Sequence, residues 1–299
     1  MSVVNSSVAL PAEVSKDRFA RGSATFAAVT GIPTEEYLDG FKDSSPDFGR
    51  YVIEWVFGDV YSRTDLDLKT RELVIIAAGA ALGATGIDVI KFHVPTAVRA
   101  GATRDQIFGV LTQVAIVAGV PTAIAAISAA AQVLEPHSQV ADDSSVALPA
   151  EVSKDRFARG SATFAAVTGI PTEEYLDGFK DSSPDFGRYV IEWVFGDVYS
   201  RTDLDLKTRE LVIIAAGAAL GATGIDVIKF HVPTAVRAGA TRDQIFGVLT
   251  QVAIVAGVPT AIAAISAAAQ VLEPHSQVAD PLLFTGLLRD GLIRDGVAG

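Results

Sequence analysis

The sequence contains no cysteine among its 299 residues. This absence excludes a disulfide bond, a thiolate nucleophile and a metal site with cysteine ligands. Aromatic residues are also scarce, at 8% of the chain, whereas hydrophobic residues make up 49%. We therefore expect a core built from Ala, Val, Ile and Leu side chains, a composition that suits closely packed helices.

Basic residues are outnumbered, with 24 Lys and Arg against 35 Asp and Glu, which gives a net charge of −11. A protein that binds nucleic acid needs a basic surface that displaces the counterions of the phosphates. The balance therefore predicts no nucleic-acid partner. It leaves room for a small anionic organic substrate, because a few local arginines are enough to shape a pocket.

The longest stretch without a charged residue runs from Gln106 to Leu134, which is long enough to span a bilayer. Gly119 and Pro121 interrupt this stretch, and proline suits the first turn of a new helix. We expect two buried helices here and no membrane partner. The N-terminal residues lack the basic and apolar regions of a signal peptide, which predicts a cytoplasmic protein.

The chain contains the same unit twice, since Ser6–Asp142 recurs residue for residue as Ser144–Asp280. We divide it into a first copy at 1–143, an identical second copy at 144–280 and a tail at 281–299, to which we assign no chemistry. An engineered single-chain dimer is our first explanation of the identity, and a very recent duplication is the second. Only Asp143 separates the copies, which suggests that the end of one unit lies near the start of the next.

The spacing of hydrophobic residues predicts an all-α fold with six or seven helices in each copy, because nothing alternates with period two for long. Thr103 and Gln106 have the spacing of a capping box, and Gly101 is placed to end the preceding helix. In the first copy we predict helices over about 15–29, 33–44, 47–61, 67–84, 87–100, the segment after Thr103, and 120–133.

Glu72 is the first candidate for chemistry, since helical spacing places it on one side with Leu68, Ile75 and Ile76. A carboxylate on such an apolar side must be paired or protonated, or must face a cavity. The pattern leaves two interpretations open. One is a helix-start glutamate paired with an arginine, and the other is a carboxylate in a functional pocket.

His93 is the second candidate, on a predicted helix face that it shares with Val89, Ile90 and Ala97. A histidine on an apolar face can simply be a core residue. Pro95 follows two positions later and fits a first helical turn if the helix restarts near His93. That restart would place the imidazole at a helix N-terminus or a kink, where it could act on a substrate.

The cationic candidates are Arg50, Arg63, Arg71 and Arg99. Arg63 stands out because it follows a helix and could fork onto a carboxylate. We expect Asp67 to serve helix-end electrostatics, and Tyr61 and Trp55 to belong to the core. One histidine and one acid that we expect to be buried in each copy are too few for a metal site, so we predict none.

Two segments of each copy resemble the carboxymuconolactone decarboxylase family. They are FGDVYSRTDLDLKTRELVIIAAGAALG and FHVPTAVRAGATRDQIFGVLTQVAIVAGVPTAIAAI, and the resemblance covers roughly 47–130 in the first copy. It implies an all-α helical bundle of the carboxymuconolactone decarboxylase or alkylhydroperoxidase D-like type. Some relatives are thiol peroxidases with a Cys-x2-Cys-x3-His arrangement, which this chain lacks. The resemblance therefore implies the decarboxylase branch, and a homo-oligomer in which three fused pairs form a pseudo-hexamer.

The reaction that this resemblance implies removes CO₂ from a carboxylated butenolide. The conjugated lactone carbonyl accepts the electrons, so no cofactor is expected. The resemblance makes His93 the acid that protonates carbon and Glu72 the group that orients it or relays the proton, while Arg63 or Arg71 holds the substrate's carboxylates. In the second copy the corresponding residues are His231, Glu210, Arg201 and Arg209.

Two other functions stay open from the sequence. One is a different proton-transfer enzyme on the same scaffold, such as an isomerase or a cyclase. This alternative is prompted by residues 61–66, which read YSRTDL where the family's decarboxylases often have WSRPGL. The other is a non-catalytic, engineered single-chain assembly subunit.

Overall fold

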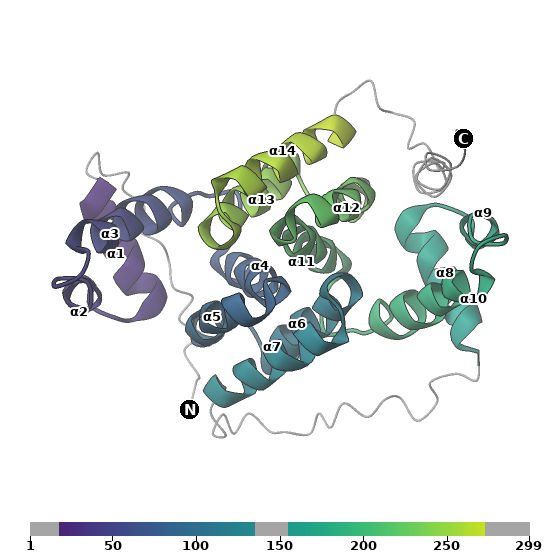
Figure 1. The fold of residues 1–299 in the computed structure, drawn as a ribbon, viewed down its shortest axis with the longest axis horizontal. Helices are drawn as coiled ribbons and strands as arrows, with labels where there is room; N and C mark the ends of the chain where they lie inside the picture. Colours follow the sequence, from purple (N-terminus) through teal and green to yellow (C-terminus); the bar gives the residue numbers. More distant parts are fainter. Residues whose placement is uncertain (1–17, 135–154, 273–299) are drawn as a thin grey trace, which may run out of the picture.

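A computed structural model describes residues 18–134 and 155–272, which are coloured in Figure 1. Within these two ranges the chain forms helices and no β-strand, so the predicted all-α fold is confirmed. The junction between the copies and the C-terminal tail lie outside the described residues.

The described part of each copy repeats one order of elements. In the first copy they are α1 (Arg18–Thr30), α2 (Thr34–Asp39), α3 (Pro46–Tyr51), η1 (Val52–Val60), α4 (Leu68–Ala81), η2 (Gly83–Gly86), α5 (Ile87–Arg99), α6 (Arg104–Ala118) and α7 (Val120–Val133). In the second they are α8 (Arg156–Thr168), α9 (Thr172–Asp177), α10 (Pro184–Tyr189), η3 (Val190–Val198), α11 (Leu206–Ala219), η4 (Gly221–Gly224), α12 (Ile225–Arg237), α13 (Arg242–Ala256) and α14 (Val258–Leu272).

Several helix ends follow from local sequence signals. The Asp67 carboxylate caps α4 and accepts a hydrogen bond from the backbone N–H of Thr70 at 3.0 Å. Thr103 and Gln106 form the predicted capping box at the start of α6. Gly101 has φ +88°, a left-handed backbone that glycine adopts without strain after the end of α5. These ends are thus set by side chains within a few residues of each terminus.

The uncharged stretch divides as expected, with α6 ending at Ala118 and α7 beginning at Val120. Gly119 between them has φ +85°, and a proline lies in the first turn of α7. None of the helices in the two described ranges is long and apolar enough to cross a membrane.

The helix predicted over 87–100 is confirmed, and it does not restart near His93. α5 is continuous from Ile87 to Arg99, and Pro95 lies inside it. Both Pro95 and Lys91, whose carbonyl loses its helical donor, are exposed, so water can satisfy that carbonyl. The opposite side of α5 is buried and includes Ile90, His93 and Ala97. His93 therefore lies in mid-helix, on the packed face.

The helix predicted over 47–61 changes its winding part-way. α3 is followed directly by η1, a π-helix. At its end the N–H of Tyr61 donates to the carbonyl of Val56 at 2.8 Å, a bond across five residues. π-Helical turns are rare and often occur at functional sites, because they change the direction of the side chains that follow.

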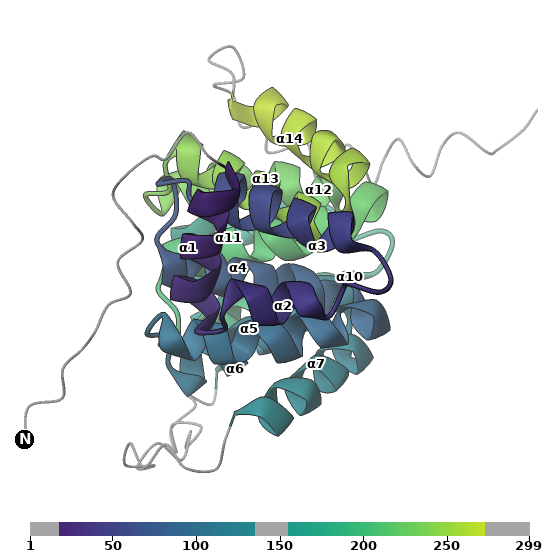
Figure 2. The ribbon, with the colours of Figure 1, turned by 90° about the vertical axis from the view of Figure 1, so that its left-hand side faces the viewer.

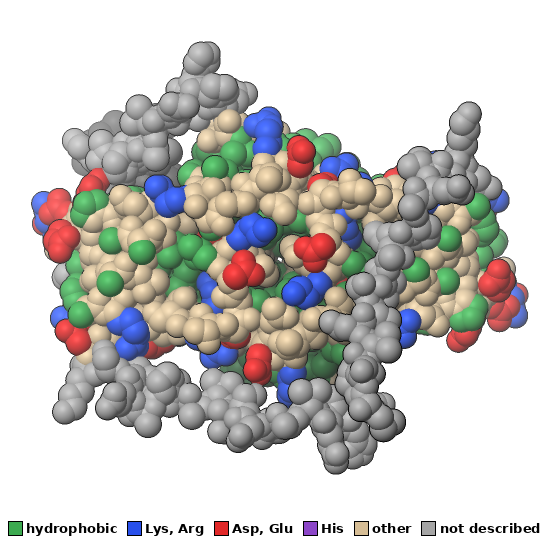
Figure 3. Space-filling view, turned by 180° about the vertical axis from the view of Figure 1, so that it is seen from behind, with side chains coloured by type: hydrophobic (Ala, Val, Ile, Leu, Met, Phe, Trp, Pro, Cys, Tyr) green, Lys and Arg blue, Asp and Glu red, His purple; other side chains and the backbone are tan. Residues whose placement is uncertain are grey.

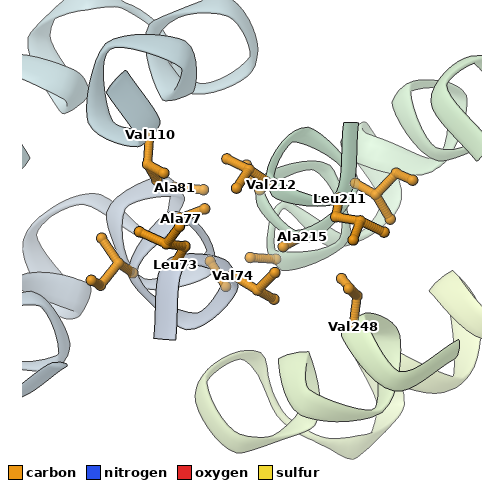
Figure 4. Close-up of a cluster of buried hydrophobic side chains, with 14 of the residues drawn as sticks. Leu73, Val74, Ala77, Ala81, Val110, Leu211, Val212, Ala215 and Val248 are labelled. Carbon is orange, nitrogen blue, oxygen red and sulfur yellow. The ribbon is translucent and has the colours of Figure 1, made fainter. Parts of the chain in front are cut away.

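The two copies share one hydrophobic core. α4 and α11 lie side by side at the centre of the molecule, between α5–α7 on one side and α12–α14 on the other (Figure 1). Figure 4 shows Val74 of α4 and Ala215 of α11 among the apolar side chains between these two helices. Val74, Leu73 and Val212 are each 0% exposed and belong to one cluster with residues of both copies.

The N-terminal helices of each copy form a smaller unit at one end of the molecule (Figures 1 and 2). In the first copy this unit has its own aromatic core around Phe26 and Phe57, against which Ile254 of α13 packs. In the second copy Ile116 of α6 packs against the equivalent core. Each end unit therefore contacts a helix from the other copy.

Charged side chains of both signs lie close together in the middle of the face seen in Figure 3. The described residues visible on that face form no broad field of one sign.

Candidate functional site

A buried acid and an imidazole meet between α4 and α5. Oε2 of Glu72 and Nδ1 of His93 lie 2.8 Å apart. Glu72 is 0% exposed, whereas His93 is 8% exposed, so the histidine is the more accessible of the two. The second copy repeats the pair, with 2.8 Å between His231 and Glu210. The two residues that sequence reasoning singled out separately are thus direct partners.

The partner of Glu72 decides between the two interpretations of its sequence position. Among the described residues it is paired with His93 and with no arginine, so the arginine-paired alternative is wrong. An ionised Glu72 accepts the proton on Nδ1, which leaves Nε2 of His93 as the nitrogen that can exchange a proton with a ligand.

Tyr61 completes this pair in the first copy, at the point where η1 ends. Its hydroxyl lies 3.4 Å from Nδ1 of His93, and the residue is fully buried. Burial, and then the negative charge of Glu72, raise the pKa of the Tyr61 hydroxyl well above its usual range. The phenol therefore stays neutral beside the carboxylate. The expectation that Tyr61 is buried is confirmed, but its contact with the pair was missed.

Arg71 lies one residue before Glu72 and is also fully buried. Its Nη2 donates to Oδ1 of Asp65 at 2.8 Å and to the carbonyl of Arg63 at 3.2 Å. Its Nη1 donates to Oε1 of Gln251 at 3.0 Å, and its guanidinium carbon lies 5.8 Å from the centre of the Tyr61 ring. The Arg71 guanidinium thus connects the loop before α4 with Gln251 of the other copy and with the Tyr61 ring.

Arg63 differs from Arg71 in being accessible, with 43% of its side chain exposed. Its Nε and Nη2 both donate to Oδ2 of Asp65, at 2.7 and 2.5 Å, so it does fork onto a carboxylate. Partial burial of Asp65 raises the pKa of its carboxyl, but the hydrogen bonds and charges of Arg63 and Arg71 outweigh that effect and lower it below its usual value. Asp65 is therefore an anion that holds two arginines in place.

The model of the carboxymuconolactone decarboxylase family matches the chain twice, over residues 46–132 and 184–270. The chain belongs to this family. The two matched ranges repeat the duplication and include every site residue named so far. Within the described residues there is no group of three or more His, Asp or Glu side chains that could hold a metal ion.

Two curated proteins and one solved structure are similar to the chain. A 4-carboxymuconolactone decarboxylase of Acinetobacter baylyi is 31% identical over 98 residues, which are 33% of this chain and 72% of that protein. An uncharacterised 15.0 kDa protein of Paracoccus denitrificans is 33% identical over 91 residues, 30% of this chain and 68% of its own length.

The solved structure is that of a provisionally assigned gamma-carboxymuconolactone decarboxylase subunit of Burkholderia xenovorans LB400. It has a TM-score of 0.50 and 22% identity, and the match covers 93% of this chain and all of that one. At this identity the likeness shows a shared fold.

Three further site residues could not be assigned from the sequence. The sequence pattern places Tyr61 in the core and singles out neither Asp65 nor Gln113, which is the counterpart of Gln251. The one available signal was the glutamine itself. An amide in the middle of an uncharged helix needs a buried hydrogen-bond partner, although the sequence does not say which.

Proposed function

We propose that the chain is a cofactor-independent decarboxylase of a small carboxylated lactone, of the kind named for its Acinetobacter relative. The observation that carries this proposal is the buried Glu72–His93 pair, which occurs in both copies with the same 2.8 Å separation. Such a pair sets the tautomer of the imidazole and leaves one ring nitrogen for proton transfer.

In the proposed first step Arg63 binds a carboxylate of the substrate. Its exposed side chain is held by Asp65, which supports this assignment. The bond between the substrate's ring carbon and the departing carboxylate then breaks. CO₂ leaves, and the electron pair moves into the conjugated lactone carbonyl, which becomes an enolate.

In the second step Nε2 of a protonated His93 donates its proton to carbon. The lactone carbonyl reforms, and His93 takes up a proton from water, so each turnover consumes one proton. Glu72 accepts from Nδ1 throughout and holds the ring in place. The assignment of Arg71 to substrate binding stays a prediction, and its present contacts suit a structural anchor better.

The duplication offers a direct test of this assignment. Replacing both histidines, as His93→Gln with His231→Gln, should lower kcat by about 10²- to 10⁴-fold, the usual contribution of a general acid. Either replacement alone should leave about half of the wild-type rate per chain, because one intact site remains in each case. CO₂ release from 4-carboxymuconolactone is the measurement.

The remaining two histidines provide the control, since His137→Gln with His275→Gln should retain the full rate. An unchanged rate in the His93 and His231 double variant would overturn the general-acid assignment. Proton exchange or isomerisation of the lactone without release of CO₂ would instead identify the chain as another proton-transfer enzyme. No turnover of any related lactone would favour the non-catalytic subunit.

We further propose that the protein assembles as a trimer of the two-copy chain. The supporting observation is a stripe of exposed aromatic side chains on α3 and η1. Phe48, Tyr51 and Trp55 are 54%, 61% and 37% exposed, so the expectation that Trp55 belongs to the core is wrong. The second copy carries the same stripe. Aromatic side chains at helical spacing on a surface are typical of an interface with another subunit.

A further inference from the structure

Two buried glutamines connect each copy to the candidate site of the other. Gln251 on α13 and Gln113 on α6 are both 0% exposed. The amide oxygen of Gln251 accepts from Nη1 of Arg71 at 3.0 Å, and its Nε2 donates to the backbone carbonyl of Arg71 at 2.7 Å. Gln113 makes the same two contacts with Arg209, at 3.0 and 2.6 Å.

The position of these contacts matters because Arg71 directly precedes Glu72. One amide holds both the guanidinium and the backbone at this point of α4. The Nε of Arg71 has no hydrogen-bond partner within the described residues, so its two terminal nitrogens carry all of its hydrogen bonds there. Loss of the Gln251 amide would leave a second buried donor of a charged group unpaired, which is costly.

The same face of α13 also receives Asp65. Gly247 lies one turn before Gln251, and a Cβ atom at Gly247 would be 2.6 Å from Oδ2 of Asp65. Gly109 of α6 stands in the same relation to Asp203. The glycine lets the carboxylate approach the helix, and the glutamine one turn later binds the arginine that this carboxylate holds. Two positions on one helix of the second copy thus support the first copy's site.

We propose that Gln251 and Gln113 are positioning residues, each for the site in the other copy. Gln251 orients Arg71, which lies against the Tyr61 ring and fixes the part of α4 next to Glu72. In this way Gln251 sets the geometry of the Glu72–His93 pair. Neither copy then has a complete site by itself. This inference rests on the proposed function for its activity measurement, but its structural content can be measured separately.

Because the two copies are fused, the effect of Gln251 on the first copy's site and that of Gln113 on the second copy's site can be measured separately. A His231→Gln background leaves only the first copy's site active. In that background Gln251→Leu should lower kcat/KM by up to about 100-fold, the scale expected for misplacement by about 1 Å. Gln113→Leu is the matched control, since it makes the same change at an equally buried position but serves the site that is already inactive. In a His93→Gln background only the second copy's site is active. There Gln113→Leu should lower kcat/KM, and Gln251→Leu should be the control.

The second measurement is the NMR titration of the His93 ring, assigned by its disappearance in His93→Gln. Gln251→Leu should shift its titration midpoint, whereas Gln113→Leu should leave it unchanged. Equal effects of the two variants in one background, or an unmoved His93 signal in Gln251→Leu, would overturn the proposal. If the parent chain releases no CO₂, the proposed function fails, and the NMR comparison still decides the positioning.

A milder pair of variants covers the case in which leucine prevents folding. Gln251→Glu retains an acceptor for Arg71 but loses the donor to its carbonyl, so its effect on the His93 signal should be smaller and in the same direction. Gln113→Glu is again the control. A Gln251→Glu chain with a His93 titration identical to that of Gln113→Glu would contradict the inference.

Discussion

Two different side chains lie on the Nδ1 side of the His93 imidazole, a carboxylate and a neutral hydroxyl. Glu72 accepts the ring proton at 2.8 Å, while the neutral hydroxyl of Tyr61 lies 3.4 Å away. In the second copy the hydroxyl of Tyr199 has no hydrogen-bond partner among the described residues, although the His231–Glu210 pair is intact. The acid–imidazole contact is therefore the part of the site that both copies keep.

The buried tyrosines predict a loss of stability at alkaline pH. Burial raises the pKa of Tyr61 and Tyr199 in the folded protein well above 10, the usual value. Unfolding releases these hydroxyls to ionise, so their contribution to stability is complete below pH about 10 and is lost as pH rises from there through the folded pKa. In Tyr61→Phe with Tyr199→Phe the free energy of unfolding should fall less steeply above pH 10.

Urea unfolding at several pH values between neutral and strongly alkaline would measure the slope with which the free energy of unfolding falls as pH rises. An identical slope in the Tyr61 and Tyr199 variant and in the parent would show that the buried hydroxyls do not control alkaline stability.

At the scale of the elements, α5 shows tertiary packing prevailing over local preference. A proline inside a helix removes a hydrogen bond and costs about 3 kcal/mol relative to alanine. α5 nevertheless continues through Pro95, because its other face is buried against the core. Packing of this buried face holds His93 opposite Glu72 of α4, and it outweighs the cost of Pro95 on the exposed face.

That cost predicts that removing the proline stabilises the protein. Pro95→Ala, with Pro233→Ala in α12, should restore one hydrogen bond in each helix and raise the free energy of unfolding by roughly 2 kcal/mol per helix, after the greater freedom of the unfolded chain is deducted. Pro121→Ala with Pro259→Ala is the control. Those prolines lie in the first turn of α7 and α14, where no donor is needed, so no gain is expected. Chemical denaturation of the three chains gives the comparison.

At the scale of the whole molecule, the boundary between the copies is a core and not a surface. Leu73, Val74, Leu211 and Val212 are each 0% exposed within one cluster that both copies build. Separating the copies would expose side chains of this kind at about 1.5–3 kcal/mol each. One copy alone should therefore associate with a second one through the same face.

Light scattering tests both levels of assembly together. The full chain should have the mass of a trimer, and a chain of residues 1–143 should form a hexamer, so that both particles contain six copies. A full chain that stays a monomer would contradict the proposed trimer. A monomeric 1–143 chain would contradict the shared core. Tyr51→Lys with Tyr189→Lys, on the exposed aromatic stripe, should reduce the full chain to a monomer. Tyr51→Lys alone should reduce the 1–143 chain to a dimer.

Much of the site's composition could be predicted from the sequence, because local rules apply to it. Glu72 and His93 are polar residues at apolar helix positions, and Asp67, Thr103 and Gly101 carry the standard signals of helix ends. The contact between Glu72 and His93 could not be predicted from these rules. It joins residues on two helices, and it depends on how α4 and α5 cross.

By itself, the sequence determined the all-α fold, the two identical copies and the exclusion of thiol chemistry, and it singled out Glu72 and His93 as candidates. The fold and the two candidates follow from the spacing of residues along helices, the copies follow from the repeated sequence, and the exclusion follows from composition. Only the tertiary structure decided that Glu72 binds His93, that Tyr61 lies beside them and that α5 runs through Pro95. It alone showed that Gln251 reaches Arg71 from the other copy. The reason is physical: hydrogen bonds between residues 180 positions apart in the chain are set by the packing of α4, α11 and α13, and a pattern along one helix carries no information about that packing.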